Sequence, residues 1–147
     1  MTPITHFCFP LICAMAVDSP RGWQDPPAFT KRELIEIGIG GMLPDIIDPH
    51  LSLALRLGSW THSIIFVLLI VAIIKIMDVH HSCRWQHWFV FAVGSHLFLD
   101  ALSGGVRLWY PAEHVVGGTL IPFFLWLPID VVCASTAYFL WWRRFIR

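Results

Sequence analysis

Six histidine and aspartate side chains of this sequence have the types and the spacing of a metal site. They are His6, Asp45, Asp48, His62, His96 and Asp100. The last two are four residues apart, so on a helix they share one face. Imidazole nitrogens and carboxylate oxygens are the usual ligands of a catalytic zinc, which keeps one position open for water. Such a metal lowers the pKa of its water toward neutrality and polarises the bond to be cleaved.

Each of these groups alone has an ordinary structural explanation. A helical HxxxD pair such as His96 and Asp100 more often forms a hydrogen bond than a metal site. Asp45, which follows Pro44, could simply end a helix and begin a turn. Six such groups on one face of a 147-residue apolar protein would be hard to explain by chance. The argument for a metal therefore depends on where the surrounding elements place them.

The composition is that of a membrane protein. Hydrophobic residues make up 56% of the 147 residues and charged residues 14%, whereas a soluble domain carries about a quarter charged residues. The mean hydropathy is +0.66. The length predicts a single domain over residues 1–147, and the formal net charge of zero provides no basic field for nucleic acid. The lipid bilayer is the expected partner, and ionisable residues within it suggest function because they are costly there.

Five apolar stretches predict an all-α fold, a polytopic membrane bundle of about five helices. We expect the helices at about residues 4–17, 30–44, 62–77, 86–102 and 119–142. Thr30 and Glu33 have the spacing of a capping box, which predicts the start of the second helix. Gly38, Gly40 and Gly41 in that helix would let another helix approach closely. The last stretch, at about 24 residues, is the only unambiguous full span, and the first three are short for a hydrocarbon core of about 30 Å.

The Lys and Arg residues predict an orientation in the membrane. If five helices alternate with the N-terminus outside, eight of the ten Lys and Arg residues lie inside and the C-terminus is cytoplasmic. This is the bias that the positive-inside rule expects. All six histidine and aspartate groups then lie at or near the outer face. Because the orientation rests on Lys and Arg alone, this convergence is an independent argument for a site.

Other polar residues leave alternatives open. Asp130, in the last stretch, could hydrogen-bond a metal-ligating histidine from outside the site, or merely pair with another polar group of the bundle. A further cluster lies on the inner side, where a solvated loop is a better explanation than a second metal site. Its members are His80, His81, Cys83 and His87.

At the site residues the sequence resembles a family of bacterial inner-membrane, metal-dependent hydrolases, the YdjM-like group that includes LexA-regulated members. The matching segments are GMLPDI at residues 41–46, THS at 61–63, GSHLFLDALS at 94–103, GV at 105–106 and LWYP at 108–111. Their order and spacing fit the family from about residue 5 to residue 122, and His6 stands where the family has an early histidine. More distantly, an Asp, a His and a later HxxxD are similar to the metal-binding framework of zinc-dependent phospholipase C. That resemblance implies that the ligands are Asp45, His62, His96 and Asp100.

Two departures separate this chain from the family pattern. The family usually has Pro-Asp-x-Asp-His, whereas residues 44–50 are PDIIDPH, so that the second acid, Asp48, is displaced by one position. The family also has His-Arg-Gly before its Thr-His-Ser, whereas residues 57–60 are LGSW. If the missing groups hold a second metal or the charge of the transition state, this protein could bind metal and still be a poor or altered enzyme.

The favoured hypothesis is a membrane-bound hydrolase that uses a divalent metal, zinc by its ligands, to activate water for attack on a phosphoester or another ester. The four implied ligands would hold the metal, and Asp48 or His6 would be a further ligand or the general base. A site at headgroup depth suggests a lipid or lipid-linked substrate. The alternative is a non-enzymatic membrane scaffold or accessory subunit with a hydrogen-bonded polar core. A metal or proton carrier is a third hypothesis, for which polar groups across the membrane are sparse.

Overall fold

The helices of this protein were located in a computed structural model that describes residues 2–18, 28–49, 57–76 and 83–146. Within these residues the chain forms five α-helices and two short 3-10 helices. They are α1 (Pro3–Asp18), α2 (Lys31–Ile47), η2 (Trp60–His62), α4 (Ile64–Ile76), α5 (Cys83–Ser103), η3 (Phe123–Leu125) and α6 (Trp126–Phe145). The described part has no β-strand and only two isolated β-bridges. The prediction of an all-α fold of about five helices is therefore confirmed.

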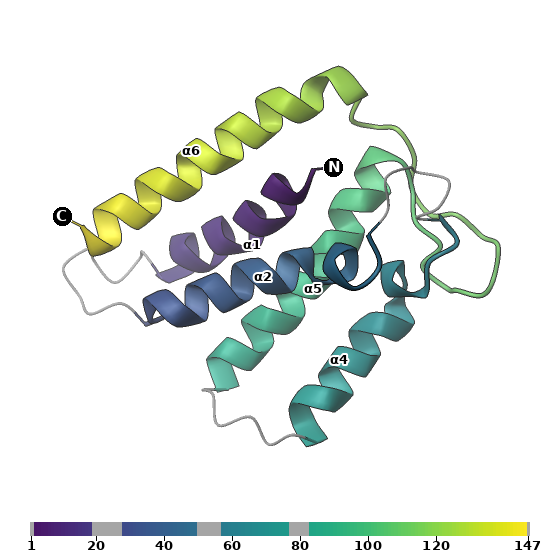
Figure 1. Cartoon of the computed structure of the whole chain (residues 1–147), viewed down its shortest axis with the longest axis horizontal. Helices are drawn as coiled ribbons and strands as arrows, with labels where there is room; N and C mark the ends of the chain where they lie inside the picture. The colour runs from purple at the N-terminus through teal and green to yellow at the C-terminus, as the bar shows by residue number, and fades with distance from the viewer. Residues whose placement is uncertain (1, 19–27, 50–56, 77–82, 147) are drawn as a thin grey trace.

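Helix α1 lies between α2 and α6 and also touches α5 (Figure 1). Helix α2 packs along α5 on its other side, and α4 packs against α5. Successive helices run in alternating directions, so that the start of α1, the end of α2, the start of α4 and the end of α5 gather at one end of the bundle (Figure 1). We call this the site end.

The capping box predicted at the start of α2 is confirmed. The Thr30 hydroxyl accepts from the Glu33 backbone N–H, and the Glu33 carboxylate accepts from the Thr30 backbone N–H at 2.8 Å. The end of this helix differs from the prediction, because α2 continues through Pro44 to Ile47. The Asp48 N–H donates to the Pro44 carbonyl at 3.0 Å and closes a further turn. Asp45 therefore lies within a helix and not in a turn.

The last helix begins later than its predicted start at residue 119. The Gly118 N–H donates to the Ala101 carbonyl at 2.9 Å, and the Ile121 N–H donates to the Leu102 carbonyl at 3.1 Å. These bonds hold the segment against the end of α5, so helical structure begins only after Pro122. The 23 residues Phe123–Phe145 form the one helix of the described chain that is long and apolar enough to cross a membrane by length and composition. Helices α1 and α4 are apolar but shorter.

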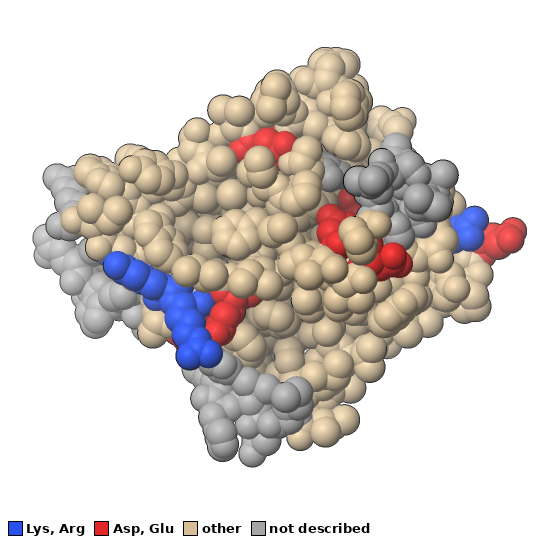
Figure 2. Space-filling view, viewed as in Figure 1, with Lys and Arg blue, Asp and Glu red and all other residues tan. Residues whose placement is uncertain are grey.

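The surface is largely apolar, while the interior at the site end is polar. Much of the face seen in Figure 2 carries neither positive nor negative side chains. Large hydrophobic side chains are exposed along α4 and α6, among them Leu68, Ile76, Leu127, Val132 and Tyr138. Such a surface suits contact with lipid.

The opposite end of the bundle holds the basic residues of the described helices. Lys31 and Arg32 stand at the start of α2, Lys75 at the end of α4, Arg84 at the start of α5, and Arg143 and Arg144 at the end of α6. On the face seen in Figure 2 the basic side chains gather mainly over the start of α2. We call this the basic end.

An ion-pair cluster joins three helices at the basic end. The carboxylate of Asp18, at the end of α1, accepts from Arg144 of α6 at 2.6 Å and lies 3.4 Å from Arg84 of α5. The Asp18 side chain is 7% exposed and that of Arg144 is 6% exposed, so this pair meets away from most of the solvent, while the Arg84 side chain is 37% exposed. The cluster fixes the ends of α1, α5 and α6 relative to one another.

Helices α1 and α2 approach each other closely at Gly41. A Cβ atom at Gly41 would lie 2.1 Å from the backbone oxygen of His6, a distance that real contacts do not reach. A Cβ at Gly38 would meet the ring of Phe7 at 2.6 Å. The close approach predicted from these glycines is confirmed, and it sets the position of the His6 backbone.

We predict that Gly41→Ala destabilises the protein by about 1–3 kcal/mol, the usual cost of overpacking, because the new methyl group collides with the α1 backbone. Gly94→Ala is the matched control, since a Cβ atom added at Gly94 would meet nothing within 4 Å. This variant should be more stable than the unaltered protein by about 0.5–1 kcal/mol, the usual advantage of alanine over glycine within a helix. Thermal unfolding of the detergent-purified protein, followed by circular dichroism, measures both. Equal stability of the two variants would contradict the close approach.

Candidate metal centre

Five of the six predicted site residues meet at the site end of the bundle. They come from four separate segments: the start of α1, the end of α2, η2 and, for two of them, α5. They are His6, Asp45, His62, His96 and Asp100. Four of these are at most 1% exposed, while the Asp45 side chain is 26% exposed. Asp45 therefore marks the side on which the group is open.

Asp45, His62 and His96 form the first of two overlapping groups. The Nε2 atom of His62 lies 3.1 Å from Oδ1 of Asp45 and 3.2 Å from Nε2 of His96. Nε2 of His96 lies 3.6 Å from the same Asp45 oxygen. The ligand atoms that these three residues offer all lie within 4.8 Å of one another. Three groups in this arrangement could hold one metal ion.

Asp100 joins this group to His6. Its Oδ2 atom lies 3.3 Å from Nε2 of His96 and 3.5 Å from Nε2 of His62. Its Oδ1 atom lies 3.3 Å from Nε2 of His6. The ring of His6 stacks on that of His96 with 3.9 Å between centroids. Each Asp100 oxygen thus faces imidazole, and His6, His96 and Asp100 form the second candidate group.

The hydrogen bond of His96 fixes which of its nitrogens could bind a metal. Its Nδ1 lies 2.8 Å from the carbonyl oxygen of Gly41. A carbonyl can only accept, so Nδ1 carries a hydrogen, and in the neutral ring Nε2 then has the lone pair. Metal-ligating histidines commonly donate their other ring N–H to a carbonyl or carboxylate in this way. The backbone of α2 therefore turns Nε2 of His96 toward Asp45 and Asp100.

The chemistry of the buried groups fits a divalent cation. Neither ring nitrogen of His6 makes a hydrogen bond of acceptable geometry within the described residues, although both are buried. Buried polar atoms normally have a hydrogen-bond partner, and a metal ion can take that place by binding the lone pair of an imidazole nitrogen. The two carboxylates bring two negative charges that a divalent ion would balance. The described residues therefore contain a buried His/Asp group that could bind a metal.

Asp48 and Asp130 lie outside both groups. Asp48 accepts a hydrogen bond from the Ser59 hydroxyl at 2.6 Å. Asp130 accepts from the hydroxyls of Thr2 and Thr5. It thus contacts the residue before His6 and ties the start of α6 to the start of α1.

Sequence reasoning missed the groups that orient the histidines. The Gly41 carbonyl belongs to the backbone, which no residue pattern reveals. The hydroxyl of Thr61 lies 3.1 Å from Nδ1 of His62. The Ser63 hydroxyl donates to the Trp60 carbonyl at 2.6 Å.

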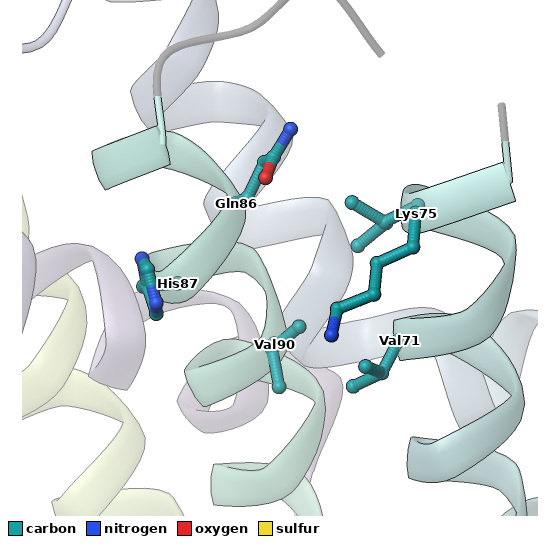
Figure 3. Close-up of a pocket in the computed structure, with 6 residues that line it drawn as sticks. Val71, Lys75, Gln86, His87 and Val90 are labelled. Carbon is teal, nitrogen blue, oxygen red and sulfur yellow. The ribbon is translucent and has the colours of Figure 1, made fainter. Parts of the chain in front are cut away.

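The histidine and cysteine residues of the basic end show no comparable convergence where they are described. His80 and His81 lie outside the described residues. Nδ1 of His87 lies 2.7 Å from the carbonyl oxygen of Cys83, which is the contact of neighbouring turns in a helix. His87 also lines a shallow pocket between α4 and α5, across which Lys75 reaches toward Val90 (Figure 3). The lining of this pocket is mostly apolar and includes no carboxylate.

The helices and the buried polar group together define a small helical protein with an apolar surface and a candidate metal centre at one end. A family model described as YdjM inner membrane protein matches residues 1–146. The chain therefore belongs to the YdjM inner membrane protein family, as the sequence motifs indicated. Membership supports association with the lipid bilayer and a location in the inner membrane.

No curated protein sequence and no solved structure matches this chain. The resemblance to zinc-dependent phospholipase C is not shown by these comparisons and stays a prediction.

We predict that His96→Ala removes bound metal and leaves the helices intact, because His96 belongs to both candidate groups. His87→Ala, an exposed histidine on the same helix, is the control and should retain metal. Elemental analysis by mass spectrometry of the detergent-purified proteins measures metal per chain. Stoichiometric metal in the double variant His62→Ala/His96→Ala would show that ions bind elsewhere.

Proposed function

We propose that this chain is a metal-dependent hydrolase of the inner membrane that uses zinc to cleave a phosphoester or another ester. The observation that carries the proposal is the buried convergence of three imidazoles and two carboxylates from four separate segments. Zinc takes nitrogen and oxygen ligands of these kinds. When bound, it would supply a water of lowered pKa and would polarise the ester.

The ligands in this proposal are Asp45, His62, His96 and Asp100. The partial exposure of Asp45 supports it as the ligand beside the open position, where substrate and water would enter. His6 would be a further ligand or the general base, because its Nε2 faces the Asp100 carboxylate. The close packing of α1 on α2 at Gly41 would hold His6 in register with the other groups.

A lipid or lipid-linked ester is the substrate class that we propose. The site end lies beside helices whose outward side chains are large and apolar, so a substrate anchored in the bilayer could reach it without leaving the membrane. In the orientation that the positive-inside rule favours, five helices would cross the membrane, the N-terminus and the site would face outward, and the C-terminus would be cytoplasmic.

Hydrolysis assays test the catalytic part of the proposal. The zinc-loaded protein in detergent micelles is expected to hydrolyse a chromogenic phosphodiester or carboxylic ester, and His62→Ala should lower kcat/KM by on the order of 100-fold or more. Removal of zinc with a chelator should abolish turnover, and added zinc should restore it. Zinc-loaded protein that turns over no ester would contradict the catalytic part of the proposal. Absence of stoichiometric zinc would favour the scaffold hypothesis, to which the short contact of 3.1 Å between Nε2 of His62 and Oδ1 of Asp45 also lends support.

Reporter fusions test the orientation. A fluorescent protein fused after residue 147 should fluoresce, because it folds in the cytoplasm, and alkaline phosphatase inserted in the loop near Glu113 should be active, because it matures outside the inner membrane. The loop residue is exposed, so the insertion should be tolerated. The reverse pattern of activities would overturn the proposed orientation and would place the site at the cytoplasmic face.

A further inference from the structure

A chain of hydroxyl groups connects Asp48 to His62. The Ser59 hydroxyl donates to Oδ2 of Asp48 at 2.6 Å and lies 2.6 Å from Oγ1 of Thr61. That oxygen in turn lies 3.1 Å from Nδ1 of His62. Ser59, Thr61 and His62 are 4%, 0% and 1% exposed, so the bonds among these three residues are shielded from water.

The direction of every bond in this chain follows from the number of hydrogens available. A carboxylate can only accept, so the single hydrogen of the Ser59 hydroxyl points to Asp48. Ser59 must then accept from Thr61, which uses the single hydrogen of Thr61. Thr61 is left only as an acceptor, so Nδ1 of His62 must carry a hydrogen.

The same bonds saturate Ser59. Besides the Thr61 hydroxyl, its oxygen accepts the backbone N–H of Thr61 at 3.2 Å. A hydroxyl has one hydrogen and two lone pairs, and all three are used. If the donors and acceptors exchanged roles along this series of bonds, Ser59 could no longer donate to Asp48. The Asp48 carboxylate therefore sets the direction of the hydrogen bonds.

We propose that Asp48 is a positioning residue that acts through Ser59 and Thr61 to keep the hydrogen of His62 on Nδ1, so that Nε2 presents its lone pair to the metal. The inference rests on the proposed function, since it takes His62 as a metal ligand. In this account Asp48 is neither a ligand nor the general base. His96 reaches the same state by a simpler route, through the Gly41 carbonyl.

The first two members of this hydrogen-bonded chain, which we call the relay, lie where the sequence departs from the family pattern. Asp48 is the displaced acid of the PDIIDPH segment, and Ser59 belongs to the LGSW segment that stands in place of His-Arg-Gly. The two departures meet in one hydrogen bond. They therefore form a connected feature of this chain instead of two separate losses.

Helix capping is the structural role that the test must separate from the relay. Ser59 is the N-cap of η2, and its oxygen accepts from the Thr61 N–H. Capping needs the Ser59 oxygen only, whereas the relay also needs the Thr61 hydroxyl and the Asp48 carboxylate. Variants at Thr61 and Asp48 are therefore more informative than variants at Ser59.

The test measures zinc affinity of the full chain in detergent, with Zn²⁺ alone as the probe and a chromophoric chelator as competitor. Thr61→Val removes the hydroxyl at nearly constant volume, and Asp48→Ala removes its acceptor. Each should weaken zinc binding by about 10–100-fold, the usual effect of losing a group that orients a ligand histidine. Thr61→Ser keeps a hydroxyl and should restore affinity. Ser95→Ala is the matched control, because the buried Ser95 hydroxyl donates only to the Ala92 carbonyl.

The visible absorption spectrum of Co²⁺-substituted protein gives a second readout that a lost cap alone would not move. Thr61→Val and Asp48→Ala should change the bands of the bound ion, and Thr61→Ser and Ser95→Ala should not. Circular dichroism checks that each variant keeps its helices.

Unchanged zinc affinity and unchanged cobalt bands in both Thr61→Val and Asp48→Ala would overturn the relay while leaving the proposed function standing. Failure of the unaltered chain to bind zinc would overturn the proposed function, and the relay with it. Weaker binding that Thr61→Ser restores would support the relay.

Discussion

Asp100 is 1% exposed, and each of its carboxylate oxygens lies beside an imidazole nitrogen. A buried carboxylate without partners is very costly, so this arrangement requires histidines to reach it from other parts of the chain. His6 comes from α1 and His62 from η2, while His96 lies one turn back on α5. The need to partner Asp100 therefore determines which ends of the helices must meet. The ion pairs of Asp18 fix three helices at the opposite end.

Close packing of α1 on α2 makes that meeting possible. Gly41 lets the His6 backbone approach, and its carbonyl accepts the hydrogen of His96. One residue thus places one histidine and orients another. The hydroxyl relay from Asp48 would do for His62 what Gly41 does for His96. In both histidines the contact at Nδ1 leaves Nε2 facing the carboxylates. A neutral imidazole with its hydrogen on Nδ1 can bind a metal through Nε2.

Much of this arrangement was predictable from sequence, because the signals were local. The hydrophobic stretches indicated the helices, the capping box located the start of α2, and the sorting of Lys and Arg brought the site residues to one end. The predicted start of the last helix was wrong, because backbone hydrogen bonds from Gly118 and Ile121 to the end of α5 hold that segment out of a helix despite its apolar sequence. The partner of Asp48 could not be predicted either, since Ser59 is 11 residues away in the sequence and no local pattern pairs the two. Backbone acceptors such as Gly41 carry no sequence signal at all.

X-ray absorption at the zinc edge of the zinc-loaded protein tests the metal centre most directly. The account predicts only nitrogen and oxygen ligands, at about 2.0–2.2 Å, with the outer scattering of at least two imidazole rings. In His62→Ala the imidazole contribution should fall. Sulfur scattering at about 2.3 Å, or a shell of oxygen alone, would contradict the account, because the ion would then be bound by groups other than the buried histidines and aspartates.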